Sequence, residues 1–107
     1  YLNAGLKPVM DDAIIAKFRK GTKPGKFVDK TEFESIKKSS DAALIRLDED
    51  LGNNLFTNIT PFTISSYGIE VKNIGDVLKV LLHHEGLHLG YCMALKRALS
   101  YHGNGSL

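Results

Sequence analysis

The sequence of 107 residues contains no tryptophan, a single cysteine and three prolines, and neither sign of charge dominates it. The lone Cys92 cannot form a disulfide within the chain, and no apolar run approaches the roughly 20 residues that span a bilayer. A formal net charge of +2, with the signs interspersed, gives no concentrated basic field of the kind that phosphate binding requires. We therefore expect a cytoplasmic protein that has neither nucleic acid nor a membrane as a partner.

The residues that are present suit one small globular domain. A hydrophobic content of 43% and a charged content of 24% are ordinary, and the length allows one core, so we expect a single domain over residues 1–107. Apolar residues recur at helical spacing in three stretches, which predicts an all-α fold. We expect these helices at residues 9–19, 31–50 and 74–101, with a long packed loop at 52–72 that holds a short extended piece at 62–64.

Capping residues set the expected ends of these helices. Thr31 and Glu34 have the spacing of a capping box, and Asn73 with Asp76 marks the start of the last helix. At the other end of the chain, Tyr1 to Ala4 read as the last turn of a helix, with Gly5 as its left-handed C′ residue. We therefore expect the chain to begin within a longer helix, with part of the protein upstream.

The last predicted helix carries a pair of histidines on one face. At about 100° per residue, His84 and His88 lie about 40° apart, at the centre of a stripe that also holds Val77, Val80, Leu81, Tyr91, Leu95, Ala98 and Leu99. Residues four apart on a helix stand one above the other, so two imidazole nitrogens can converge on one ion. We expect both rings to point into the core and to bind one divalent metal.

A second interpretation is that both rings are core histidines whose nitrogens are satisfied by hydrogen bonds. Two titratable rings in one apolar stripe each incur a desolvation cost, and a shared cation is the simplest partner for both, which favours the metal. Such a site usually needs a third protein ligand. His83 and Glu85 point away from the pair, and His102 lies about 21 Å further along the helix, so we assign none of these as a ligand.

Two neighbours of the pair receive lesser roles. Tyr91 lies about one turn from His88 and two turns from His84 on the same face, where it can pack in the core or hydrogen-bond a ligand of the metal. Cys92 falls at the margin of the stripe, and packing is its expected role because free cysteine is among the most buried residue types.

The pattern His84-Glu85-x-x-His88 also occurs in zinc proteases, where the glutamate activates water. The extended protease pattern requires a glycine and a third histidine at positions that Tyr91 and Ala94 occupy here. The other large group takes a downstream glutamate as third ligand, and residues 89–107 contain no Asp or Glu. A zinc protease is therefore the least favoured reading.

The segment from Val80 to Gly90, in which His-x-x-x-His is followed by one residue and a glycine, resembles the closing motif of the DinB-like (DinB/YfiT) family. A segment ending in Phe-Arg-Lys-Gly, a basic loop, a capped helix and the entry Asn73-Ile74-Gly75-Asp76 extend the resemblance over essentially the whole chain. Only the histidine segment is specific enough to count as a motif.

The resemblance implies an up-down-down-up four-helix bundle whose metal is held by three histidines. His84 and His88 match the helical pair, and the third ligand comes from the family's second helix. No histidine precedes His83 here. The resemblance therefore implies that the sequence lacks the first helix and most of the second, and that the third ligand lies upstream of Tyr1.

The resemblance also suggests an activity. Family members of known activity include metal-dependent transferases that use bacillithiol, mycothiol or a similar low-molecular-weight thiol, so we expect a thiol S-transferase or a hydrolase. Zinc or nickel is the expected metal, with iron or manganese as alternatives, and a homodimer is implied by resemblance only. A different class stays open, namely a stress-associated, non-catalytic binding module whose metal only stabilises the bundle.

Overall fold

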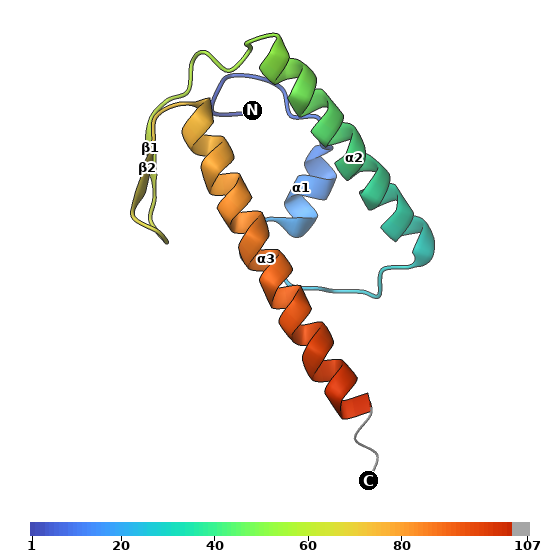
Figure 1. Ribbon diagram of the computed structural model, residues 1–107. Coiled ribbons are helices and arrows are strands. Elements are labelled where there is room, and N and C mark those ends of the chain that lie inside the picture. Colours follow the sequence, from blue (N-terminus) through green and yellow to red (C-terminus); the bar gives the residue numbers. More distant parts are fainter. Residues whose placement is uncertain (104–107) are drawn as a thin grey trace. The chain divides into compact units, whose positions relative to one another are not determined.

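The structure is a computed structural model that describes the backbone of residues 1–103 and the side chains of residues 1–101. This part of the chain is mostly helical, with α1 (Asp12–Phe18), α2 (Lys30–Gly52) and α3 (Ile74–Gly103) spanning 7, 23 and 30 residues (Figure 1). Two short strands, β1 (Phe62–Ile64) and β2 (Ile69–Val71), form an antiparallel hairpin. The helical prediction is confirmed in its coarse form, and the hairpin corrects the expectation of an all-α chain.

The chain divides into two compact units, one from Tyr1 to Thr60 and one that begins at Pro61. The first contains α1 and α2, and the second contains the hairpin and α3. The expectation of one domain stays a prediction.

The first unit opens with a tight turn. Leu6 N donates to Tyr1 O at 2.9 Å, Gly5 N donates to Leu2 O at 3.0 Å, and Gly5 has a φ of +73°. These two bonds are those of a Schellman motif, in which the left-handed C′ position favours glycine. The predicted geometry of this turn is confirmed.

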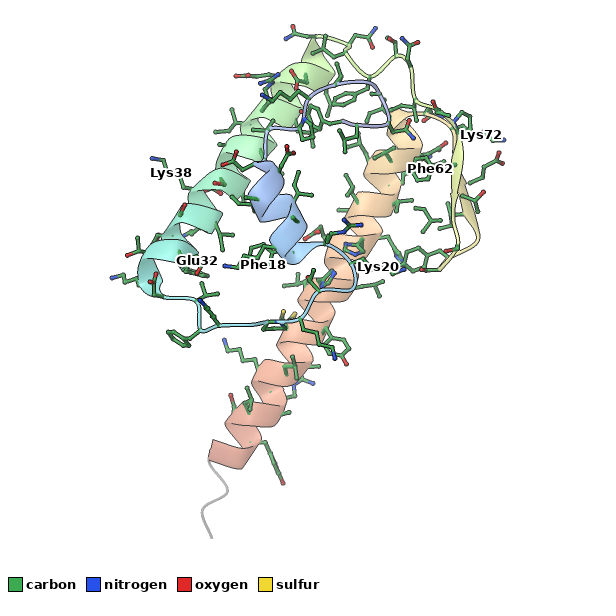
Figure 2. All side chains as sticks on the ribbon, turned by 180° about the vertical axis from the view of Figure 1, so that it is seen from behind. Phe18, Lys20, Glu32, Lys38, Phe62 and Lys72 are labelled. Atoms are coloured by element: carbon green, nitrogen blue, oxygen red, sulfur yellow. The ribbon has the colours of Figure 1, made fainter. Side chains whose placement is uncertain are left out.

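Helix α2 begins one residue before its predicted start. The Asp29 side chain accepts a hydrogen bond from Glu32 N at 2.8 Å, which makes Asp29 the N-cap. The predicted capping box at Thr31 is therefore wrong, because Thr31 already lies inside the first turn. Glu32, labelled in Figure 2, also forms an ion pair with Lys17 of α1. Helix α1 itself is shorter than predicted and has no side-chain cap.

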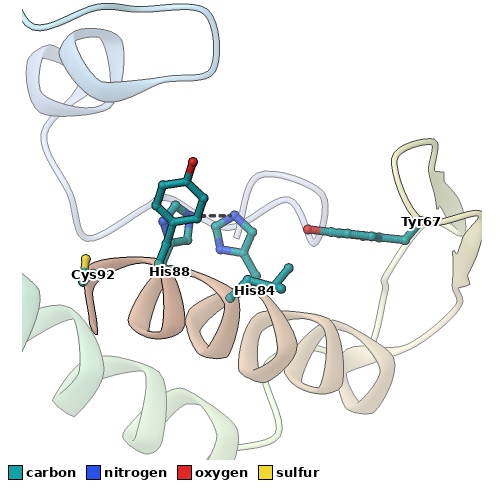
Figure 3. Close-up of a pocket in the computed structure, with 6 residues that line it drawn as sticks. Tyr67, His84, His88 and Cys92 are labelled. Carbon is teal, nitrogen blue, oxygen red and sulfur yellow. Dashed lines mark hydrogen bonds between the residues drawn. The ribbon is translucent and has the colours of Figure 1, made fainter. Parts of the chain in front are cut away.

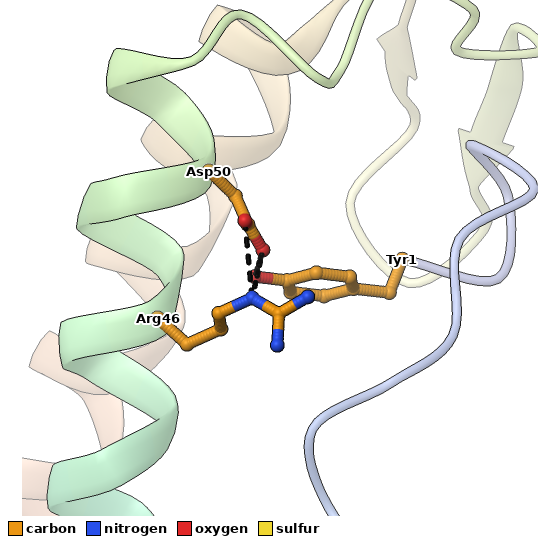
Figure 4. A network of polar contacts seen from close by, with 3 residues as sticks. All are labelled: Tyr1, Arg46 and Asp50. Carbon is orange, nitrogen blue, oxygen red and sulfur yellow. Dashed lines mark hydrogen bonds and ion pairs between the residues drawn. The ribbon is translucent and has the colours of Figure 1, made fainter.

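A polar cluster joins the opening turn to α2 (Figure 4). The Tyr1 hydroxyl donates to Asp50 Oδ2 at 2.7 Å, and Arg46 Nε donates to both carboxylate oxygens at 2.9 and 3.0 Å. Asp50 is only 4% exposed, and the edge of the Tyr1 ring packs on Phe56 with centroids 5.1 Å apart. The Tyr1 hydrogen bond, assisted by Arg46, lowers the pKa of Asp50, while burial and the same bond raise the pKa of Tyr1.

In the second unit, the hairpin precedes α3 directly. Phe62 pairs with Val71 and Ile64 pairs with Ile69, so four residues form the loop between the strands. Val71 is fully buried. The predicted extended piece at 62–64 is confirmed, whereas its partner strand was missed.

The start of α3 follows the sequence closely. Asn73 Oδ1 accepts a hydrogen bond from Asp76 N, and Asp76 Oδ2 accepts one from Lys72 N, both at 3.0 Å. The first bond satisfies a backbone donor that the first helical turn leaves unpaired, and the second satisfies the amide just before the cap. The predicted cap and the predicted continuous helix are confirmed.

Candidate metal centre

The uninterrupted helix α3 brings His84 and His88 together on one face. Their Nε2 atoms lie 3.2 Å apart, and their ring centroids lie 4.4 Å apart at an interplanar angle of 63° (Figure 3). Without a cation, this distance allows one neutral ring to donate its proton to the other. The two nitrogens converge as the sequence spacing predicts.

The separation of the two nitrogens fits a shared cation. If each Nε2 atom bound the ion at about 2.1 Å, their 3.2 Å separation would give an N–metal–N angle of about 99°. This value lies between the roughly 90° of octahedral and the roughly 109° of tetrahedral coordination. The separation of the two nitrogens is therefore compatible with both coordination geometries.

Glu85 lies beside the opposite edge of the His84 ring. Its Oε1 atom is 3.6 Å from His84 Nδ1, beyond hydrogen-bond range, and its side chain is 75% exposed. At this distance the carboxylate does not fix the orientation of the ring, as a hydrogen-bonded neighbour of a metal-bound histidine would. Glu85 is therefore placed behind His84 and not on the side where the two Nε2 atoms meet.

A pocket of about 360 Å³ opens at the histidine pair (Figure 3). Apolar and aromatic side chains dominate its wall, and all of them come from the second unit: Tyr67, His84, Leu87, His88, Tyr91 and Cys92. Tyr91 thus lies beside the pair, as the helical projection predicts. The pocket provides room for a small molecule next to the Nε2 atoms.

The pair is more accessible than the sequence suggests. The His84 side chain is 48% exposed, and every residue of α3 from Leu81 to Tyr101 is exposed. The prediction of an inward, buried stripe is therefore wrong beyond Val80, and so is the packing role predicted for Cys92, which is exposed. Within this unit, a hairpin with strands of three residues, about 10 Å long, cannot cover a helix of about 45 Å.

Tyr67 is the member of the pocket that sequence reasoning missed. Its ring packs edge-on against His83, with centroids 5.5 Å apart and an interplanar angle of 84°. Tyr67 lies in the hairpin loop, 17 residues before His84 in the chain, so no helical periodicity could link the two. The signal available in the sequence is Gly68, because glycine is typical of turns. In the structure Gly68 follows Tyr67 in the hairpin loop with a φ of +64°.

No third protein ligand joins the pair in the part of the chain that the structure describes. Among the side chains of residues 1–101, no three or more His, Cys, Asp or Glu groups are placed to hold a metal ion. His83 packs on Tyr67 instead, and the His102 side chain lies outside the described residues. The His84–His88 pair by itself supplies two of the positions that zinc or nickel fills.

The comparisons with known proteins add no relative. No family model, curated protein or solved structure matches this chain. Separately, none of the helices in the described residues combines the length and the apolar character that crossing a bilayer requires. An assignment of function therefore depends on the residues and their geometry.

Proposed function

We propose that His84 and His88 bind one divalent metal ion, zinc or nickel in the first instance, with iron or manganese as alternatives. The observation that carries the proposal is the 3.2 Å separation of their Nε2 atoms, which suits a shared ion between octahedral and tetrahedral geometry. The two nitrogens are accessible and lie on one regular helix, so little reorganisation opposes binding.

We also propose that the chain belongs to a DinB-like four-helix bundle. The support is the Val80–Gly90 segment, together with a long capped last helix and a capped helix α2 that follows a basic loop. The three-histidine set of that family would leave one ligand to come from outside the described residues, because none of them supplies it.

The proposed activity is that of a metal-dependent transferase or hydrolase that acts on a small molecule, for example a low-molecular-weight thiol. A divalent cation lowers the pKa of a bound thiol or water and so provides a nucleophile at neutral pH. In this chain His84 and His88 would hold the ion, and the pocket beside them would bind and orient the substrate.

Two alternatives are less well supported. A closed coordination sphere is typical of a purely structural metal, whereas this pair faces a pocket with room for a small molecule. A zinc protease would need Glu85 on the metal side of His84, and its carboxylate lies near Nδ1 instead.

The proposal is tested by cobalt and zinc titration of the chain and of His84→Ala and His88→Ala. The unaltered chain should bind one ion, and each substitution should weaken binding about 100-fold, because one ligand of a chelating pair is lost. His83→Ala is the matched control, since His83 is adjacent in sequence and packs on Tyr67. Equal affinity of all four proteins would refute the metal site.

A further inference from the structure

The pocket contains one hydroxyl group that comes from outside α3. Tyr67 lies in the hairpin loop, where Ile64 O accepts hydrogen bonds from Tyr67 N at 3.1 Å and from Gly68 N at 2.8 Å. The left-handed Gly68 and these two bonds fix the loop backbone from which the Tyr67 side chain projects. The loop therefore presents Tyr67 in a defined direction.

That direction is toward the histidine pair. Figure 3 shows the Tyr67 side chain extended toward His84 with its hydroxyl end leading. The edge-to-face contact with His83 holds the ring from one side, and Tyr67 stays 39% exposed. Within the described residues its hydroxyl makes no hydrogen bond to the protein, so the group is available to a molecule in the pocket.

We propose that Tyr67 is a ligand-binding residue of this site, and that its hydroxyl donates a hydrogen bond to a small anionic molecule bound beside the His84–His88 pair. This inference rests on the proposed metal site. The donor atom of such a molecule, an anionic sulfur or oxygen, would approach the cation through the pocket, and a phenolic O–H is a suitable donor for either. The wall around it, with Leu87 and Tyr91, suits a molecule with an apolar body.

The geometry also explains why the hydroxyl, and not only the ring, would matter. The aromatic contact with His83 needs no hydroxyl, so a phenylalanine at position 67 would keep the packing and lose the donor. The Tyr67→Phe variant therefore separates ligand binding from the architecture of the loop.

The test uses the cobalt-loaded chain and two probes, 2-mercaptoethanol for sulfur and acetate for oxygen. Each probe is titrated while the visible absorption of cobalt, and for the thiol the sulfur-to-cobalt charge-transfer band, is recorded. Tyr67→Phe should weaken the binding of at least one probe about three- to tenfold, the value of a partly exposed hydrogen bond, and should leave cobalt affinity unchanged. Tyr101→Phe is the control, because it removes a hydroxyl further along α3 and outside the pocket wall. It should change neither the affinity for the probes nor the affinity for cobalt.

The outcomes distinguish the two proposals. If the unaltered chain binds no cobalt, or if His84→Ala binds cobalt with the same affinity as the unaltered chain, the metal site is refuted and the role of Tyr67 with it. If cobalt binds at the pair but Tyr67→Phe binds both probes with the original affinity, only the role of Tyr67 is refuted. A loss of cobalt affinity in Tyr67→Phe would also refute it, because Tyr67 would then act on the ion or on the fold.

Discussion

Moving one histidine around α3, without changing the composition, gives a stringent test of the metal pair. Exchanging residues 88 and 93, by combining His88→Met with Met93→His, places the second imidazole about 180° around the axis from His84 and about 13.5 Å along it. Position 93 is solvent-exposed, with Met93 58% accessible, so the exchange disturbs no buried contact there. The residues three and four positions away from it are Leu89, Gly90, Lys96 and Arg97, none of which is a metal ligand.

The expected loss follows from the geometry. In the unaltered helix the two Nε2 atoms lie 3.2 Å apart, so the second ligand binds at a high effective concentration once the first is bound. The exchanged protein can use only one imidazole at a time, and zinc affinity should fall about 10²- to 10⁴-fold. This corresponds to about 2.7 to 5.5 kcal/mol of binding free energy.

The matched control exchanges residues 87 and 88, by combining Leu87→His with His88→Leu. An imidazole at position 87 stands three residues from His84 and four from His83, both spacings that bring side chains together on a helix. Zinc affinity should therefore stay within about tenfold of the original. Competition against a chromophoric chelator at neutral pH measures the affinity, and circular dichroism confirms the helix content. Tight binding by the 88/93 exchange, within threefold of the original chain, would refute the assignment of the pair.

Three further predictions concern the surroundings of the site and the fold. Glu85→Gln should change zinc affinity less than about threefold, because the Glu85 carboxylate is 75% exposed and lies beyond hydrogen-bond range of His84. A loss of zinc binding in a titration would contradict this expectation. Tyr1→Phe removes the hydrogen bond that lowers the pKa of Asp50. A carboxyl whose pKa is lowered in the fold stabilises the protein above its unfolded pKa of about 4, and this stabilisation is lost as the pH falls through the folded pKa, so the acid-unfolding midpoint of Tyr1→Phe should shift to higher pH. Circular dichroism measures this midpoint, and an unchanged value would contradict the role of the cluster. Asn73→Ala should lower the free energy of unfolding by about 1 kcal/mol in urea titrations, since the N-cap of α3 is lost, and an unchanged value would contradict that role.

Local signals predicted α3 and its histidine pair well. A cap at Asn73, helical periodicity and the i, i+4 spacing all act within a few residues, and the structure confirms them. The start of α2 shows the limit of the same reasoning. Asp29 and Thr31 are both good N-cap residues, and the sequence does not decide between them, whereas the bond from Glu32 N to Asp29 does.

Features that depend on pairing or packing between separate elements were not predicted. The strand Ile69–Val71 is defined by its pairing with β1, and the sequence analysis expected the equally short β1 without this partner. The position of Tyr67 in the pocket follows from that hairpin, so it was missed as well. The exposure of the histidines was predicted wrongly. Periodicity shows which residues share a face of the helix, but it does not show whether another element covers that face.

The spacing of His84 and His88 by one turn has a consequence for the local opening of α3. An ion that binds both rings requires the intervening turn to stay helical, so metal binding and helix fraying are linked equilibria. At an ion concentration 100-fold above the dissociation constant, opening of this turn would cost about 2.7 kcal/mol more than in the metal-free chain. Backbone amides around residues 84–88 would then exchange with solvent deuterium about 100-fold more slowly, and the ion would act as a staple across an exposed stretch of helix.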